Sequence, residues 1–281
     1  MSIIKKLREY LNRPLSFIMF LLIIISTVIT ALTVVFIIGY IFIKGVPNLS
    51  LDLFSLKYSS SNQSMLPSII NTGYLTALTL LLAVPIGFFS AIYLAEYSRK
   101  NSFFVKIINI ANETLSGIPS IVYGLFGFLA FVISKKWGYS LLAGVITLAI
   151  MVLPLIIRTS QEAMLGVDNT FREASYGLGA GKLRTVFKIV LPSAMPGILS
   201  GIILAIGRIV GETAALIYTA GTVPEAATKL TSSSRTISVH LYCLLNEGLY
   251  TEQAYATAVV LIVFVVIINA LSNALAKKIM K

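Results

Sequence analysis

Long uninterrupted runs of apolar residues dominate this sequence, and short polar segments separate them. A helix needs about 20 mostly apolar residues to cross the hydrocarbon core of a bilayer. None of the runs alternates with a period of two, so each predicts a helix and not a strand of a membrane barrel. The six predicted spans are Leu15–Ile43, Tyr74–Leu94, Ile107–Ser134, Tyr139–Ile157, Ile198–Ala220 and Ala254–Ala276.

The composition agrees with this pattern. The chain is 57% hydrophobic and 12% charged, whereas soluble proteins carry about 25% charged residues. A soluble chain of 281 residues could not hide so much apolar surface, so the predicted fold class is an all-α integral membrane protein with six transmembrane helices. We expect residues 1–14 to form a cytoplasmic N-terminal tail and residues 15–281 a single transmembrane domain. The first run is long and no clean cleavage motif follows it, which favours a retained span over a signal peptide.

The net charge of +11 follows from the predicted topology. With the N-terminus inside, fifteen of the 22 Lys and Arg residues fall in cytoplasmic segments and six fall outside. Cytoplasmic loops of membrane proteins are rich in Lys and Arg, so both termini are expected in the cytoplasm. The charge therefore requires no nucleic acid as a partner, and membrane lipid is the expected surrounding.

The stretch YGLGAGKLRT at residues 176–185 has three glycines before Lys182. A phosphate-binding loop requires a glycine five positions before the Gly-Lys pair and a hydroxyl residue after the lysine. Tyr176 and Leu183 occupy those two positions. The dinucleotide fingerprint fails as well, because Lys182 falls where its third glycine would be. We therefore expect no nucleotide site here.

The cytoplasmic segment 158–197 contains this stretch and is the largest predicted inside feature. Thr170 and Glu173 have the spacing of a capping box, which would start a short helix. The glycines would end that helix, and a second helical piece would run to Ile189 and stop at Leu191-Pro192. From the pattern alone, two interpretations remain open: a helix that docks another protein, and an interfacial helix that binds lipid headgroups.

The same segment resembles the EAA loop of ABC-importer permeases. That motif consists of Glu-Ala-Ala, three residues, Gly, nine residues, Ile, one residue and Leu-Pro. The resemblance implies a coupling helix that docks on a separate ATPase subunit, and Ser175 departs from the motif by replacing its second alanine. The matching residues are Glu173, Ala174, Ser175, Gly179, Ile189, Leu191 and Pro192.

Three further stretches resemble phosphate-transport (Pst-type) permeases, and the PstA-like half in particular. They are AVPIGFFSAIYLAEY (83–97), LSGIPSIVYGLFGF (115–128) and PGILSGIILAIGRIVGETA (196–214). The resemblance implies the MetI-like fold of a type I importer permease in a bacterial or archaeal cell membrane. Its implied partners are a second, PstC-like permease, a PstB-like ATPase dimer and an extracytoplasmic PstS-like phosphate-binding protein. The partner ATPase would bind ATP and Mg²⁺, so the chain itself would need no cofactor and would not be an enzyme.

Charged residues inside the predicted spans suggest where a substrate passes. Arg208 and Glu212 are four residues apart, so they would share one face of a continuous helix. They would either pair with each other or line the pathway, where Arg208 could bind phosphate oxygens in a bidentate manner. The RxxGET pattern at 208–213 resembles phosphate permeases and implies the pathway role. Glu113 and Thr213 are weaker pathway candidates.

Other functions stay open at this point. The chain could be an ABC permease for another oxyanion, such as sulfate or molybdate, or for a peptide. A lone Arg208–Glu212 pair suits an oxyanion better than a bulky peptide. An ion-coupled secondary carrier is a further alternative, against which the docking-type loop counts. Pro85, Pro119 and Pro154 lie inside predicted spans, where prolines kink or open helices. His240 and Cys243 are too few to form a zinc site, so no metal is expected.

Overall fold

The computed structural model describes residues 14–98 and 102–279. Apart from Pro14, the expected N-terminal tail lies outside these residues. So do seven of the cations used to predict the topology: Lys5, Lys6, Arg8, Arg13, Arg99, Lys100 and Lys281.

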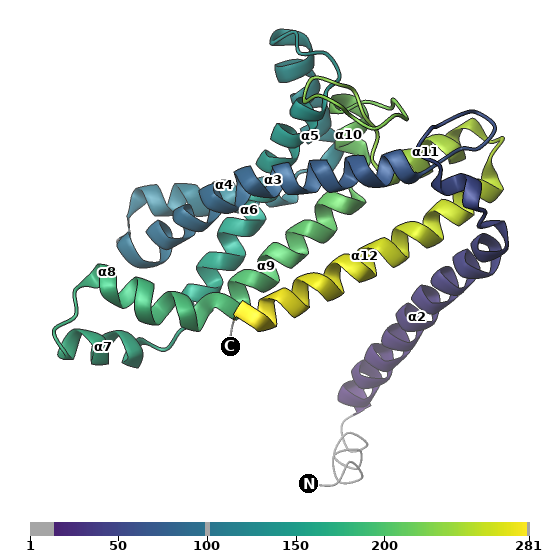
Figure 1. The fold of residues 1–281 in the computed structure, drawn as a ribbon. Helices are drawn as coiled ribbons and strands as arrows, with labels where there is room; N and C mark the ends of the chain where they lie inside the picture. Colours follow the sequence, from purple (N-terminus) through teal and green to yellow (C-terminus); the bar gives the residue numbers. More distant parts are fainter. Residues whose placement is uncertain (1–13, 99–101, 280–281) are drawn as a thin grey trace.

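The described part of the chain is mainly helical, with longer loops at 55–65 and 221–236 (Figure 1). The long helices are α2 (Pro14–Gly45), α3 (Leu66–Ile92), α6 (Leu141–Leu165), α9 (Leu191–Gly211) and α12 (Thr251–Ile279). The shorter helices are α4 (Phe103–Gly117), α5 (Ser120–Gly127), α7 (Asn169–Gly177), α8 (Lys182–Thr185), α10 (Ala214–Thr219) and α11 (Ile237–Glu247). Single turns of 3₁₀ helix are η1 (Val46–Asn48) and η2 (Leu51–Phe54), and π-helical segments are η3 (Tyr93–Tyr97), η4 (Phe128–Ser134) and η5 (Val186–Val190).

Among the described residues, five helices are long and apolar enough to cross a membrane, and the count reaches six when the bent pair α4–α5 is taken as one span. This agrees with the predicted number. The third predicted span is not straight, however, because α4 and α5 meet at an angle of 100° around Pro119. The expectation that Pro119 would interrupt a helix is confirmed, whereas Pro85 and Pro154 remain inside α3 and α6.

A second break divides the fifth predicted span, 198–220. Helix α9 ends at Gly211, and the backbone of Glu212 is extended, with ψ near 130°. The short helix α10 then starts at Ala214. A continuous helix was therefore the wrong prediction for this region. The second span differs too, because α3 begins at Leu66, eight residues before the predicted start at Tyr74.

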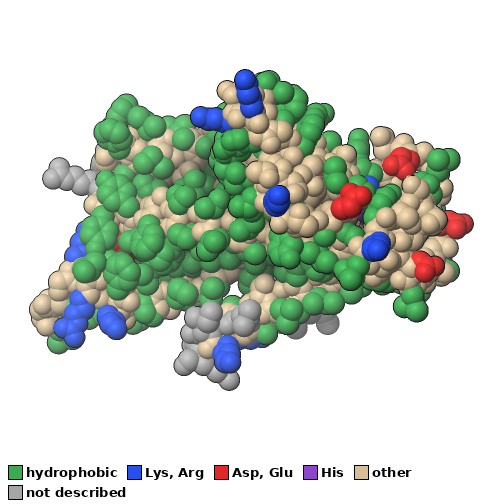
Figure 2. Space-filling view, turned by 45° about the horizontal axis from the view of Figure 1, so that its top comes forward, with side chains coloured by type: hydrophobic (Ala, Val, Ile, Leu, Met, Phe, Trp, Pro, Cys, Tyr) green, Lys and Arg blue, Asp and Glu red, His purple; other side chains and the backbone are tan. Residues whose placement is uncertain are grey.

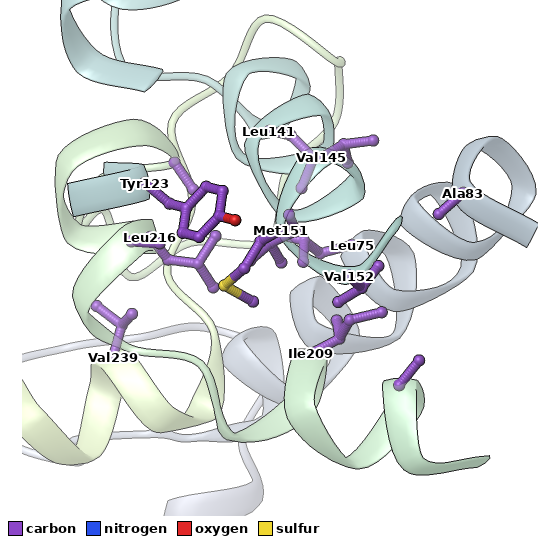
Figure 3. Packing of buried hydrophobic residues seen from close by; sticks show 14 of the residues in the cluster. Leu75, Ala83, Tyr123, Leu141, Val145, Met151, Val152, Ile209, Leu216 and Val239 are labelled. Atoms are coloured by element: carbon purple, nitrogen blue, oxygen red, sulfur yellow. The ribbon is translucent and has the colours of Figure 1, made fainter. Parts of the chain in front are cut away.

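The core lies where α6 packs between α3 and α9. Its buried side chains come mainly from α3, α6, α9 and α10, and Figure 3 shows Leu75, Met151, Ile209 and Leu216 converging there. Tyr123 of α5 reaches into the same cluster. Van der Waals packing of these groups holds the two broken helices against α6, because lipid tails are as apolar as the side chains and provide no hydrophobic driving force.

Helix α2 stands apart from this bundle, and in the described part of the chain its main contact is with α12, near the start of that helix (Figure 1). The two helices approach closely there, because a Cβ on Gly45 would clash with the carbonyl oxygen of Tyr255. The rest of α2 exposes its apolar side chains, which is the surface expected of a helix surrounded by lipid.

Acidic side chains gather at one end of the face shown in Figure 2, whereas Lys and Arg lie at the opposite end and at several other places on that face. The basic end includes Lys182, Arg184 and Lys188 of α8 and η5. The acidic end includes Asp52 of η2 and Glu252 of α12. The segment 166–190 thus forms a basic protrusion at one end of the helices.

Candidate functional site

Helix α7 starts at a side-chain cap, although not at the predicted one. The carboxylate of Asp168 accepts hydrogen bonds from the backbone N–H of Thr170, at 2.9 Å, and from its hydroxyl, at 3.0 Å. These bonds favour the charged carboxylate and lower the pKa of Asp168. The Thr170–Glu173 capping box was wrong, because Asp168 fits the capping position and Glu173 is left exposed.

The glycines act as the sequence predicted at the end of α7. The helix ends at Gly177, and Gly179 has a φ of +79°, which a residue with a Cβ rarely adopts. The chain then turns back through α8 and η5. The predicted stop at Leu191-Pro192 was wrong, because η5 continues directly into α9. Pro192 is tolerated there because it lies in the first turn of α9.

Ser175, the residue that departs from the EAA motif, is buried between α7 and α8. Its Oγ lies 2.8 Å from Oγ1 of Thr185, and Thr185 also donates to the carbonyl oxygen of Gly181. A net contribution of about 1 kcal/mol is typical for such a bond. Ser175, in place of the motif's alanine, therefore forms a hydrogen bond that joins the two helices of the α7–α8 hairpin. An alanine there would contribute only packing.

The hairpin presents a hollow surface to the outside, which we call the α7 hollow. Ala174, Ser175, Gly179 and Ile189 line this cavity of about 400 Å³. Leu178 stands beside them with 89% of its surface exposed. Phe171 also lines the hollow and is exposed, and neighbouring exposed apolar side chains of this size are typical of a protein docking site.

The seven EAA-motif residues thus separate into three sets. Ala174, Ser175, Gly179 and Ile189 meet in the α7 hollow. Leu191 instead packs inward, in a cluster with Ile92 and Met164. Glu173 and Pro192 are exposed and do not line the hollow.

A largely buried ion pair joins α7 to η3, the π-helical segment that continues α3, and it was not predicted from the sequence. Arg172 Nη2 lies 2.6 Å from Glu96 Oε1, and the two side chains are 13% and 5% exposed. The same guanidinium donates to the carbonyl oxygens of Val167 and Met164 at 2.7 and 2.8 Å. We call this arrangement the Arg172–Glu96 tether. The residues lie 76 positions apart, so only their opposite charges could have hinted at the pairing.

Arg208 lines a different cavity, between α9 and α12, which we call the Arg208 cavity. Its volume is about 650 Å³. Neither ion pair formed by the described residues includes Arg208, and the guanidinium has no hydrogen-bond partner among them. The lining residues are Leu155, Ser200, Ile203, Leu204, Gly207, Arg208, Asn269 and Asn273. An unpaired cation therefore faces a cavity without a lining acid.

Glu212 does not share this cavity, which corrects the expected geometry. Because α9 ends at Gly211, the spacing of four residues no longer places Glu212 on the same helical face as Arg208. Its carboxylate is buried and accepts the backbone N–H of Ala215 at 3.0 Å. Glu212 thus caps the start of α10, where a negative charge is favourable.

The other two pathway candidates also lie outside the Arg208 cavity. Thr213 is the N-terminal flanking residue of α10, and its hydroxyl makes one long hydrogen bond, 3.4 Å, to the carbonyl oxygen of Gly211. Glu113 lines a separate polar cleft of about 230 Å³ between α4 and α6, together with Arg158 and Gln161. The structure therefore does not bring the four candidates together.

The break between α4 and α5 and the break between α9 and α10 lie next to each other, because α5 packs on α10. Helix α5 packs so closely on α10 that a Cβ on Gly124 would lie 2.8 Å from Cα of Ala215. The hydroxyl of Tyr123 donates to the carbonyl oxygen of Leu115 across the α4–α5 break, at 2.8 Å. Irregular backbone at membrane depth is tolerated where it is buried in protein or lines a polar cavity. Both breaks satisfy that condition by packing into the core.

Comparison with known proteins identifies a family. Residues 83–281 match the family described as "Binding-protein-dependent transport system inner membrane component". The probable ABC transporter permease protein YqgI of Bacillus subtilis is 32% identical over 82% of this chain and 84% of its own length. Phosphate transport system permease proteins PstA are 33% identical in Yersinia pestis, over 84% and 81% of the two chains, and 35% identical in Haemophilus influenzae, over 77% of each.

Solved structures agree on the fold. A chain of a bacterial ABC transporter that imports the acidic polysaccharide alginate superposes with a TM-score of 0.66 over 99% of this chain and 100% of its own length, at 17% identity. A chain of the methionine ABC transporter MetNI gives 0.58, also at 17% identity, over 76% of this chain and 94% of its own length. At this identity the similarity shows the fold alone, which is that of an importer permease.

Proposed function

Because the chain belongs to the family of binding-protein-dependent transport system inner membrane components, we propose that it is a transmembrane subunit of an ATP-driven phosphate importer. The chain is a multi-pass membrane protein and a permease subunit, not an enzyme. Its relatives named as phosphate permeases match it along most of both chains, which favours phosphate over sulfate or molybdate.

The observation that carries this proposal is the unpaired guanidinium of Arg208 in its cavity. Arg208 lies in the last turn of α9, and a charge inside a span costs up to about 2.5–3.5 kcal/mol on insertion scales, the value for a helix centre. Arg208 recovers none of this cost from an acidic partner among the described residues. A doubly charged oxyanion would supply the missing partner, and a guanidinium binds such an ion through two parallel hydrogen bonds.

The α7 hollow would be the docking site of the ATPase subunit. In this proposal, an ATPase subunit covers Leu178 and the small residues of the hollow, and its closure on ATP pushes the α7–α8 hairpin. The hairpin transmits that motion by two routes: η5 continues into α9, which carries Arg208, and the tether reaches α3 through Glu96. Movement of α9 against α12 would then change the side from which the Arg208 cavity is open.

The remaining parts of the transporter would come from other chains. Importer permeases of this family work with a second permease, an ATPase and an external binding protein. For this chain we propose a PstC-like permease, a PstB-like ATPase dimer that binds ATP and Mg²⁺, and a PstS-like phosphate-binding protein. The basic end with α7 and α8 would face the cytoplasm, as Lys- and Arg-rich segments do, with both termini on that side.

Reconstituted transport tests the proposal. The complete complex should take up radiolabelled phosphate in the presence of ATP, and sulfate or molybdate should not replace phosphate. Arg208→Gln should reduce uptake by about 10- to 100-fold, because hydrogen bonds to charged groups contribute about 1.5–3 kcal/mol each. Arg208→Lys should retain part of the activity, since it keeps the charge but loses the bidentate geometry.

Assembly must be measured beside uptake. Co-purification of each variant with the ATPase and the second permease shows whether the complex still forms. Full phosphate uptake by an assembled Arg208→Gln complex would remove the basis of the proposal. Uptake by the chain alone, driven by an ion gradient without ATP, would instead establish a secondary carrier.

A further inference from the structure

Two carboxamides of α12 lie opposite Arg208 in its cavity, and nothing yet assigns them a role. Asn269 and Asn273 are four residues apart, so they lie on one face of the helix. Both line the Arg208 cavity. The span that carries them is otherwise strongly apolar, with a mean hydropathy of 2.6 in its most apolar part.

Neither amide is used to hold the described part of the fold together. Asparagines in membrane helices commonly hydrogen-bond to a neighbouring helix, but no hydrogen bond to Asn269 or Asn273 is present among the described residues. The Oδ1 atom of Asn269 is buried without a partner. Rotation about the bond between Cβ and Cγ exchanges Oδ1 and Nδ2, so each amide can offer the cavity Nδ2, which is a hydrogen-bond donor.

We propose that Asn269 and Asn273 position the oxyanion against Arg208, so that α9 supplies the charge and α12 supplies neutral donors. This inference rests on the proposed function and deepens it. The two helices pack against each other, and the lining contains no Asp or Glu that would repel an anion. Ser200 adds a hydroxyl from α9 on the same side as Arg208.

The arrangement also explains how the ion can be released. An oxyanion held between two helices loses its neutral donors when α9 and α12 move apart, while the Arg208 contact remains. One charge and a few neutral donors bind more weakly than a cluster of cations would. Weak binding suits a pathway that must pass the ion on in every cycle.

Isosteric substitutions test the proposal. Asn269→Asp keeps the size of the side chain but replaces a donor by a negative charge. In the reconstituted complex with saturating binding protein, phosphate uptake should fall at least about tenfold, which corresponds to one lost hydrogen bond to a charged group. Asn273→Asp should reduce uptake in the same direction. Gln253→Glu makes the same chemical change near the other end of α12 and should leave uptake within about twofold.

A direct binding measurement separates an anion contact from a structural role. The assembled complex without its binding protein is titrated with inorganic phosphate, and the shift of its unfolding temperature gives an apparent Kd. Asn269→Leu should weaken phosphate binding about tenfold. In the Arg208→Gln background the same change should have a much smaller effect, because both residues act on one ion.

Several results would overturn the inference. Unchanged uptake by Asn269→Asp and Asn273→Asp, in a complex that depends on Arg208, would overturn it and leave the proposed function intact. Independent, additive effects of Arg208→Gln and Asn269→Leu on phosphate affinity would do the same. Failure of the variants to co-purify with the second permease would assign the two amides to a subunit contact. A complete wild-type complex that does not transport phosphate would instead contradict the proposed function itself.

Discussion

The Arg172–Glu96 tether offers the sharpest structural prediction about how motion reaches the spans. Glu96→Gln replaces the carboxylate by an amide of the same size and leaves Arg172 with its two carbonyl acceptors. The change removes a charged contact of 2.6 Å between side chains that are 13% and 5% exposed. A hydrogen bond to a charged group contributes about 1.5–3 kcal/mol. Burial makes the upper part of that range appropriate, since a fully buried pair that loses one partner costs about 3–5 kcal/mol.

The expected consequence is local release of α7. Besides the tether, the Ser175–Thr185 contact holds the hairpin closed, and such a bond contributes about 1 kcal/mol. Losing about 2–3 kcal/mol would raise the population of the undocked hairpin about 30- to 150-fold. Amide hydrogen exchange in α7 should accelerate by a similar factor, while exchange in α6 stays unchanged.

The functional assay compares phosphate imported with ATP hydrolysed. In the reconstituted Glu96→Gln complex, ATP hydrolysis should continue while the amount of phosphate imported per ATP falls, because the motor pushes a hairpin that no longer moves α3. Glu162→Gln is the matched control, since Glu162 pairs with Arg158 at 2.9 Å but both side chains are more than half exposed. Exposed pairs contribute little to stability. Unchanged exchange in α7 together with an unchanged phosphate-to-ATP ratio would refute this reasoning.

Three further predictions follow from packing, docking and charge. Gly124→Ala should lower the thermal unfolding temperature of the complex, because the added methyl group would lie 2.8 Å from Cα of Ala215. Overpacking of this kind costs about 1–3 kcal/mol of stability. An unchanged unfolding temperature would contradict the close α5–α10 contact. Leu178→Asp should abolish co-purification of the ATPase but leave co-purification of the second permease intact; retained ATPase would exclude the α7 hollow as its docking site. Burial, and then the charge of Arg235, lower the pKa of His240 to about 3, so between about pH 6.5 and pH 3 the unfolded chain binds a proton that the folded chain does not. The thermal unfolding temperature should therefore fall with decreasing pH in that window, and the fall should be smaller for His240→Leu. Identical pH profiles of the variant and the wild type would contradict the proposed effect of His240.

The membrane spans could be predicted from the sequence because each span depends on the composition of its own segment. A run such as 15–43 is apolar along its whole length and must become a helix in a bilayer, whatever surrounds it. The α7–α8 hairpin was partly accessible for a similar reason. Gly179 needs a backbone conformation that few other residues adopt, and the sequence marks that position with a glycine.

The breaks and contacts between distant segments were not accessible in this way. Nothing in the apolar run 198–220 marks the end of α9 at Gly211, because the break is stabilised by the packing of α10 on α5 and by the cap from Glu212. Helical spacing predicted that Arg208 and Glu212 share one helix face. That prediction was wrong because α9 ends at Gly211, between the two residues. The tether and the carboxamides opposite Arg208 depend on which helices become neighbours, which local pattern does not determine.

The central claim is that this chain moves phosphate only when a separate ATPase drives it through the α7–α8 hairpin. The most direct test is phosphate uptake into liposomes that contain the chain alone, the chain with the second permease, and the complete set with the ATPase and binding protein. Our account predicts uptake only in the complete set, and only with hydrolysable ATP. Phosphate uptake by the chain alone, or by the complete set without nucleotide, would contradict it.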